Sequence, residues 1–83
     1  MTLGVIPDYL YSGFGMRIDG VSDDRPASIA GMRRGDVVVQ IDTLIVTDMM
    51  SYMTALSMFE PGVESEVTIE RNGQREQKAV IWD

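Results

Sequence analysis

The sequence predicts a mainly β domain with two helices (α+β), whose antiparallel strands form a small, partly open barrel or sandwich. Short apolar runs rich in β-branched residues, such as Val37–Ile41, are typical of buried strands. The pair Asn72-Gly73 separates two alternating segments and suits a type I′ turn, which predicts an antiparallel hairpin. Helical spacing of apolar residues is sustained from Met49 to Phe59, so the longer helix is expected there.

Two strands are expected before the first helix. Leu3–Ile6 is a short apolar run that Pro7 ends. Met16–Val21 alternates between apolar and polar residues, which predicts a strand with Met16 and Ile18 facing inward. The segment between the two strands has turn residues with apolar anchors, and we expect a loop.

A short helix and a turn follow. Pro26 suits the first position of a helix and Gly31 suits the left-handed residue that ends one. Gly35 and Asp36 then turn the chain into the buried strand. With Arg34 they also spell the tripeptide that integrins read, but such a motif needs a projecting loop. Because Asp36 leads directly into a buried strand, a structural turn is the favoured interpretation.

The second half predicts a strand, the longer helix and the hairpin. Leu44–Val46 is a short apolar strand, and Thr47 or Asp48 is expected to cap the helix after it. The hairpin strands are Val63–Arg71 and Glu76–Trp82. On the return strand either alternating set of residues could face the core, so its buried face stays open at this point.

Composition excludes several classes of function. The 83 residues suit one domain, and a net charge of −6 with seven scattered basic residues argues against nucleic-acid binding. Without His or Cys, a Ser-His-Asp triad, a Cys-His pair and a His-bearing zinc site are excluded. The acidic residues lack calcium-loop spacing, so neither a metal nor a cofactor is expected. No apolar run is long enough for membrane insertion.

Several segments resemble a known family. The pattern Pro26-Ala-x-x-Ala-Gly-Met-x-x-Gly-Asp-Val-Val38 resembles the PDZ domains of bacterial proteases. Three further segments, Leu3–Tyr9, Gly15–Val21 and Val46–Leu56, are similar to the accessory PDZ domain of bacterial zinc-dependent aminopeptidases of the di-zinc exopeptidase class. The resemblance implies a PDZ-like fold over residues 1–83, excised from a larger peptidase whose catalytic groups lie elsewhere.

The resemblance also implies a peptide-binding loop and strand. In PDZ domains an apolar-Gly-apolar loop presents backbone N–H groups to a peptide's terminal carboxylate, and here Leu3, Gly4 and Val5, after Thr2, match that loop. The peptide would then add as a strand beside Ile6 and Pro7. Pro7 departs from the pattern, because proline has no N–H to donate. Pairing beyond the last residue or two of a peptide is therefore expected to be short or absent.

The longer helix is the other wall of the groove in a PDZ domain. Met49, Tyr52, Met53 and Leu56 are the residues expected to line it. An apolar helical stripe is also the usual signature of plain core, and in so short a helix both roles must be shared. The sequence leaves these two interpretations open for each of the four residues.

The leading hypothesis is a non-catalytic module that binds C-terminal or extended peptides and so positions substrate for, or regulates, a linked zinc peptidase. The alternative is a structural domain with a degenerate groove, which packs on the catalytic domain or on a second copy as a weak homodimer. An independent enzyme is least favoured, since no nucleophile and base are available. The resemblance implies an exported protein of the periplasm or cell envelope.

Overall fold

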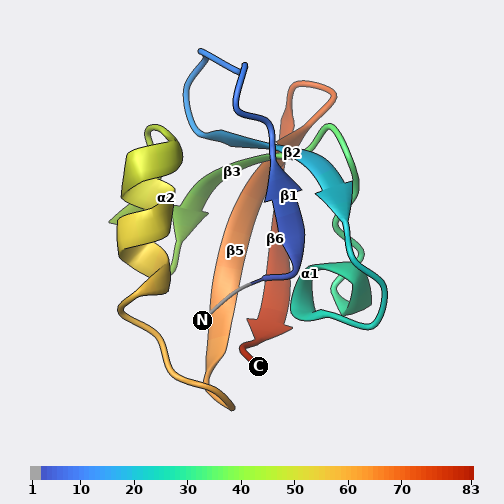
Figure 1. Cartoon of the computed structure of the whole chain (residues 1–83), viewed down its shortest axis with the longest axis vertical. Helices are drawn as coiled ribbons and strands as arrows, with labels where there is room; N and C mark the ends of the chain where they lie inside the picture. Colours follow the sequence, from blue (N-terminus) through green and yellow to red (C-terminus); the bar gives the residue numbers. More distant parts are fainter. Residues whose placement is uncertain (1–2) are drawn as a thin grey trace.

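The computed structural model describes residues 3–83, which form one six-stranded antiparallel sheet flanked by two helices (Figure 1). The strands follow the order β1-β2-β3-β5-β6, with β4 paired to β3, so β1 and β6 are the two ends of an open sheet. This confirms the predicted fold class. The elements are β1 (Val5–Pro7), β2 (Met16–Val21), α1 (Pro26–Ile29), β3 (Val37–Ile41), β4 (Leu44–Ile45), α2 (Met49–Leu56), β5 (Glu64–Arg71) and β6 (Gln74–Ile81).

The core lies between the curved sheet and the two helices. Val80 and Trp82 face it, whereas Ile81 is exposed, which answers the question that the alternating pattern left open. Trp82 donates its indole N–H to Ser65 Oγ at 2.8 Å and stacks on Phe59 with ring centroids 5.0 Å apart. The other large, fully buried side chains are Leu3, Met16, Ile18, Val38, Val39, Ile41, Val46, Tyr52, Val67 and Ile69.

Both helices begin where the sequence predicts, but α2 ends early. Asp48 caps α2 with a capping box, in which its carboxylate accepts the Ser51 N–H at 2.8 Å and Ser51 Oγ accepts the Asp48 N–H. The expected end was Phe59, whereas α2 ends at Leu56. The last turn tightens to i→i−3 hydrogen bonds, and the chain then carries Phe59 onto the core tryptophan.

The hairpin forms around the predicted turn. Asn72 and Gly73 have φ angles of 53° and 79°, as a type I′ turn requires. The return strand begins at Gln74, two residues before the expected Glu76, because pairing starts directly after the turn. At the other end of the sheet, Pro7 is the last residue of β1 rather than the residue after it, since an edge strand tolerates a residue without an N–H.

Asp36 is the centre of a buried polar network. Its side chain is 2% exposed and accepts hydrogen bonds from Arg71 Nε at 2.8 Å, Arg71 Nη2 at 2.7 Å and the Arg33 N–H at 2.9 Å. Burial by itself raises the pKa of Asp36, but the hydrogen bonds from Arg71 and Arg33 outweigh it and hold the pKa below its usual value. Asp36 therefore stabilises the turn before β3, and the buried carboxylate does not project as an integrin motif would.

Candidate functional site

Within residues 3–83, the outer edge of β1 has backbone groups that no neighbouring strand uses. Gly4 O accepts the Ser22 N–H, and the Asp8 N–H donates to β2, both at 2.9 Å. The β1–β2 register contains a bulge whose extra residue lies on β2, so the alternation along β1 is unbroken. The backbone groups of Val5 and Pro7 therefore point away from β2. They are a donor and an acceptor at Val5 and an acceptor alone at Pro7.

The loop before β1 is held by its carbonyl groups. Leu3 O accepts the Ala27 N–H at 2.9 Å, while Gly4 O is held by β2. In a trans peptide the C=O and the following N–H point in opposite directions. The Gly4 N–H therefore points away from α1, and the Val5 N–H points away from β2. Thr2, which precedes the loop, lies outside the described residues.

Glycine is required at position 4 for two reasons. Gly4 has a φ of 76°, in the left-handed region that L-residues avoid. A Cβ there would also collide with the Arg25 side chain, lying 2.7 Å from its Cγ. Arg25 is fixed by a bidentate ion pair with Asp83 at 2.8 and 2.9 Å, which raises the pKa of Arg25 and lowers the pKa of Asp83. Nothing in the local sequence signals this contact.

Side chains of β1 alternate between the two faces of the sheet. Val5 packs against the core that also contains Tyr52 and Leu56, so it faces the same side as α2. Ile6 points to the opposite face, where it is 55% exposed and packs beside Gly20. A ligand side chain inserted between β1 and α2 would therefore meet Val5 and Pro7, whereas Ile6, which was expected to line this space, lies on the other face.

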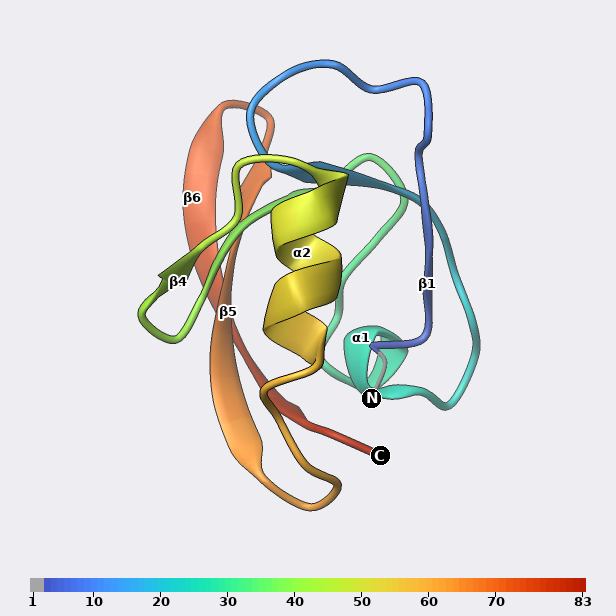
Figure 2. The ribbon, with the colours of Figure 1, turned by 60° about the vertical axis from the view of Figure 1, so that its left-hand side comes forward.

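The four residues expected on the groove helix differ in burial. Tyr52 and Leu56 are buried in the core, Met49 is half-buried, and Met53 is 57% exposed. Met49, Met53 and Leu56 follow i, i+4, i+7 spacing and share one side of α2. Figure 2 shows α2 between β4 and β1. Because residues on the opposite side of α2 face β4, the side with Met53 is the one turned toward β1.

Tyr52 is a core residue whose hydroxyl group is buried without a hydrogen-bond partner among residues 3–83. The side chain is 1% exposed. Burial raises the pKa of the Tyr52 hydroxyl. A phenol in this position cannot contact a peptide at the surface without a rearrangement of α2. Its contribution is to the packing of α2 on the sheet.

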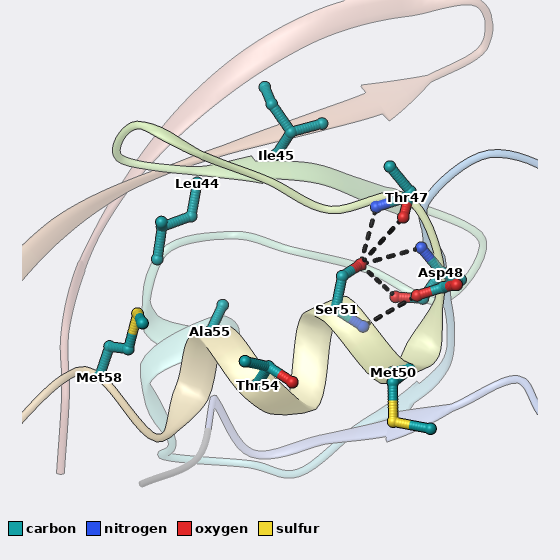
Figure 3. A pocket seen from close by; sticks show the side chains of 9 residues that line it. All are labelled: Leu44, Ile45, Thr47, Asp48, Met50, Ser51, Thr54, Ala55 and Met58. Atoms are coloured by element: carbon teal, nitrogen blue, oxygen red, sulfur yellow. Dashed lines mark hydrogen bonds between the residues drawn. The ribbon is translucent and has the colours of Figure 1, made fainter.

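A hollow of about 430 Å³ lies on the other side of α2, against β4 (Figure 3). At its polar end the oxygens of Asp48 and Ser51 are engaged in the capping box. Its apolar walls come from Leu44, Ile45, Met50, Ala55 and Met58. Sequence patterns could not distinguish this wall from core, since the residue types are the same.

A family model described as a PDZ domain matches residues 2–81. The chain belongs to the PDZ domain family. Such domains bind peptides, occur among others as accessory modules of proteases, and are generally non-catalytic. No curated protein matches this chain.

Solved structures show the same fold in several proteases. The HtrA-type protease AlgW, solved with a decapeptide, is 27% identical over 96% of this chain, with a TM-score of 0.85. An aminopeptidase N family protein from Idiomarina loihiensis is 25% identical over 98% of this chain, with a TM-score of 0.86. A serine endoprotease from Yersinia pestis is 26% identical over 94% of this chain, with a TM-score of 0.74. This PDZ domain spans 28%, 13% and 29% of those three chains.

The described residues form neither a metal cluster nor a membrane-spanning helix. Among residues 3–83, no three acidic side chains come together in a way that could hold a metal ion. Neither of the two helices in this part of the chain has the length and apolar character needed to cross a membrane.

Proposed function

We propose that this PDZ domain binds the C-terminal end of a peptide or protein as an added strand along β1. The observation that carries the proposal is the direction of the backbone groups of Val5 and Pro7, which point out of the sheet beside the apolar side of α2. The Val5 N–H and the loop around Gly4 would hold the terminal carboxylate. The decapeptide in the structure of AlgW supports a peptide as the ligand class.

Pro7 limits how far the added strand can pair. The Pro7 carbonyl can accept one hydrogen bond from the peptide. Because proline has no N–H, Pro7 cannot donate a hydrogen bond to the third residue from the peptide's end. A lost hydrogen bond of this kind costs about 0.5–1.5 kcal/mol, or about a two- to tenfold loss of affinity. Recognition would therefore depend on the carboxylate and on apolar contacts with Met49 and Met53.

The peptidase context is a second part of the proposal. We propose that the domain is an accessory module of an exported zinc-dependent aminopeptidase, where it positions substrate or regulates the linked catalytic domain. The resemblance of Leu3–Tyr9 and Val46–Leu56 to such modules and the likeness to the aminopeptidase N family protein support it. The HtrA-type neighbours support the coarser role of an accessory domain in a protease equally well.

One observation favours the alternative function, a structural domain with a degenerate groove. The missing donor at Pro7 weakens strand addition on the one edge where a PDZ ligand would bind. Under this alternative, β1 and α2 would pack against a catalytic domain. Peptides would then bind no better with a free carboxylate than without one.

Nuclear magnetic resonance titration separates the two functions. Peptides with a free, apolar C-terminal residue should shift the amide signals of Val5 and Ile6 and of the side of α2 that includes Met53. The same peptides with an amidated C-terminus should bind at least tenfold more weakly, because a charge-assisted hydrogen bond is lost. Equal binding of both forms would contradict carboxylate recognition.

A matched pair of variants tests which side of α2 is used. Met53→Gln removes an apolar contact on the side toward β1 and should lower the affinity for the peptide several-fold. Met50→Gln changes the same residue type at a more exposed site on the β4 side and should leave the affinity unchanged. Equal effects of the two substitutions would argue that the ligand lies elsewhere.

A further inference from the structure

The outer edge of β6 also has unpaired backbone groups. The turn places Arg71 opposite Gln74, and the Trp82 N–H donates to Val63 O at 3.0 Å, which sets the alternation of hydrogen bonds along β6. Every second residue from Arg75 to Ile81 therefore points its N–H and C=O away from β5. Within the described part of the chain, no backbone or side-chain group satisfies these groups. They belong to Arg75, Gln77, Ala79 and Ile81.

An open edge of this length is a template for another strand. It contains no proline, and its charged residues are Arg75, Glu76 and Lys78, of which Glu76 and Lys78 are of opposite sign. In each molecule Lys78 Nζ lies 3.4 Å from Glu76 Oε1, so the two charged groups already sit side by side. A hollow of about 280 Å³ separates α1 from the last residues of β6. Charge of one sign, which would repel a second copy, is absent from this part of the edge.

Symmetry restricts the way in which two β6 edges can pair. In an antiparallel pair related by a two-fold axis, residues whose backbone groups point outward must lie opposite residues of the same kind. The axis therefore passes at the position of one residue, which lies opposite its own copy, and not midway between two residues. An axis at Gln77 places Glu76 opposite the partner's Lys78, and Lys78 opposite the partner's Glu76. An axis at Glu76 or at Lys78 places like charges directly opposite, which is unfavourable. Among axes at Glu76, Gln77 and Lys78, charge complementarity favours the one at Gln77, which is also the one that forms two opposite-charge pairs.

We propose that β6 pairs with β6 of a second copy of this chain, antiparallel and centred on Gln77. Gln77 would oppose the partner's Gln77, and Arg75 would oppose the partner's Ala79, with two backbone hydrogen bonds for each opposed pair. The net charge of −6 on each copy opposes association, so the dimer is weak and depends on salt. Since β1 is the other end of the sheet, both β1 edges stay accessible, and the dimer presents two copies of that edge.

Disulfide trapping tests the register directly, because the chain contains no Cys. Opposed residues in a hydrogen-bonded antiparallel pair have Cα atoms about 5.5 Å apart, within the range that a disulfide spans. Gln77→Cys should therefore form a covalent dimer under mild oxidation. Ala79→Cys is the matched control on the same exposed face, and its two copies would be offset by about 13 Å along the paired strands. Mixing Arg75→Cys with Ala79→Cys should restore cross-linking.

Charge reversal tests the same pairing without a covalent bond. Sedimentation equilibrium should show a concentration-dependent dimer for the natural chain. Glu76→Lys or Lys78→Glu alone creates two like-charge pairs across the axis and should weaken the dimer about tenfold. An equimolar mixture of the two variants restores both opposite-charge pairs and should dimerise again. Circular dichroism of each variant checks that the fold is kept.

Three results would overturn the proposal. The first is a natural chain that stays monomeric at millimolar concentration and low salt. The second is Ala79→Cys cross-linking as readily as Gln77→Cys, which would show random collision rather than a defined register. The third is a mixture of the charge-reversed variants that associates no better than either variant alone.

Discussion

The two ends of the sheet are both open edges, yet they differ in length, chemistry and surroundings. β1 has three residues, and its outward groups are those of Val5 and Pro7, beside the apolar side of α2. β6 has eight residues, four of which point outward, and it is guarded by charges rather than by proline. The short edge is suited to a ligand recognised mainly by its end. The long edge is suited to a partner recognised by its register.

The sheet between the two edges holds them in place, and Asp36 is the residue whose loss should destabilise it most. Asp36→Ala leaves Arg71 without its buried partner, and we expect the free energy of unfolding to fall by about 3–5 kcal/mol. Urea unfolding followed by circular dichroism measures this. Asp19→Ala removes a carboxylate whose ion pair with Arg34 is exposed and 3.7 Å long, so it should change stability little. Similar losses for both variants would contradict a special role for Asp36.

Acidification should reproduce part of that loss. The pKa of Asp36 lies below its usual value in the folded protein, because the hydrogen bonds from Arg71 and Arg33 outweigh the effect of burial. Its contribution to stability is therefore complete above the unfolded-state pKa of about 3.9 and is lost as the pH falls through the lower, folded-state pKa. Urea unfolding at a series of pH values should show a steeper acid decline for the natural chain than for Asp36→Asn. Parallel curves would mean that other carboxylates dominate.

The conformation of the β1 edge should depend strongly on Gly4, whereas no glycine is needed in β6. Gly4→Ala places a side chain in the left-handed region and against Arg25, so it should cost about 2 kcal/mol of stability and weaken peptide binding. Thermal unfolding and peptide titration measure the two effects. The double variant Gly4→Ala with Arg25→Ala removes the collision and should recover part of the stability. A larger side chain, as in Gly4→Glu, should therefore disturb the fold as well as the peptide site.

Local conformational rules explain why much of the fold could be predicted. A positive φ at Asn72 and Gly73, or proline at the first position of α1, depends on one or two residues and their backbone sterics. The buried face of β6 could not be predicted, because Val80 and Ile81 are equally apolar and their burial depends on where β5 lies. The Arg25 contact with Gly4 was hidden for a similar reason, since it depends on an ion pair with Asp83 at the far end of the chain.

One substitution in α2, Tyr52→Phe, should make the protein more stable. Tyr52 has a buried hydroxyl without a hydrogen-bond partner among the described residues, and such a group costs about 1–3 kcal/mol. Tyr52→Phe keeps the packing and removes that cost, so the melting temperature should rise. Because Tyr52 is core rather than groove, peptide affinity should stay the same. A loss of affinity with unchanged stability would instead assign Tyr52 to the peptide site.

The smallest expected effect is also the one that bears most directly on the difference between the two edges. Pro7→Val restores an N–H at an outward-pointing position of β1, so a peptide should bind about two- to tenfold more tightly. The gain should require the third residue from the peptide's end, because that residue's carbonyl is the acceptor. Titration of a tripeptide and of the matching dipeptide would show a gain for the first and none for the second. If neither peptide gains, proline is not what limits the β1 edge, and its short length or the position of α2 must account for the difference from β6.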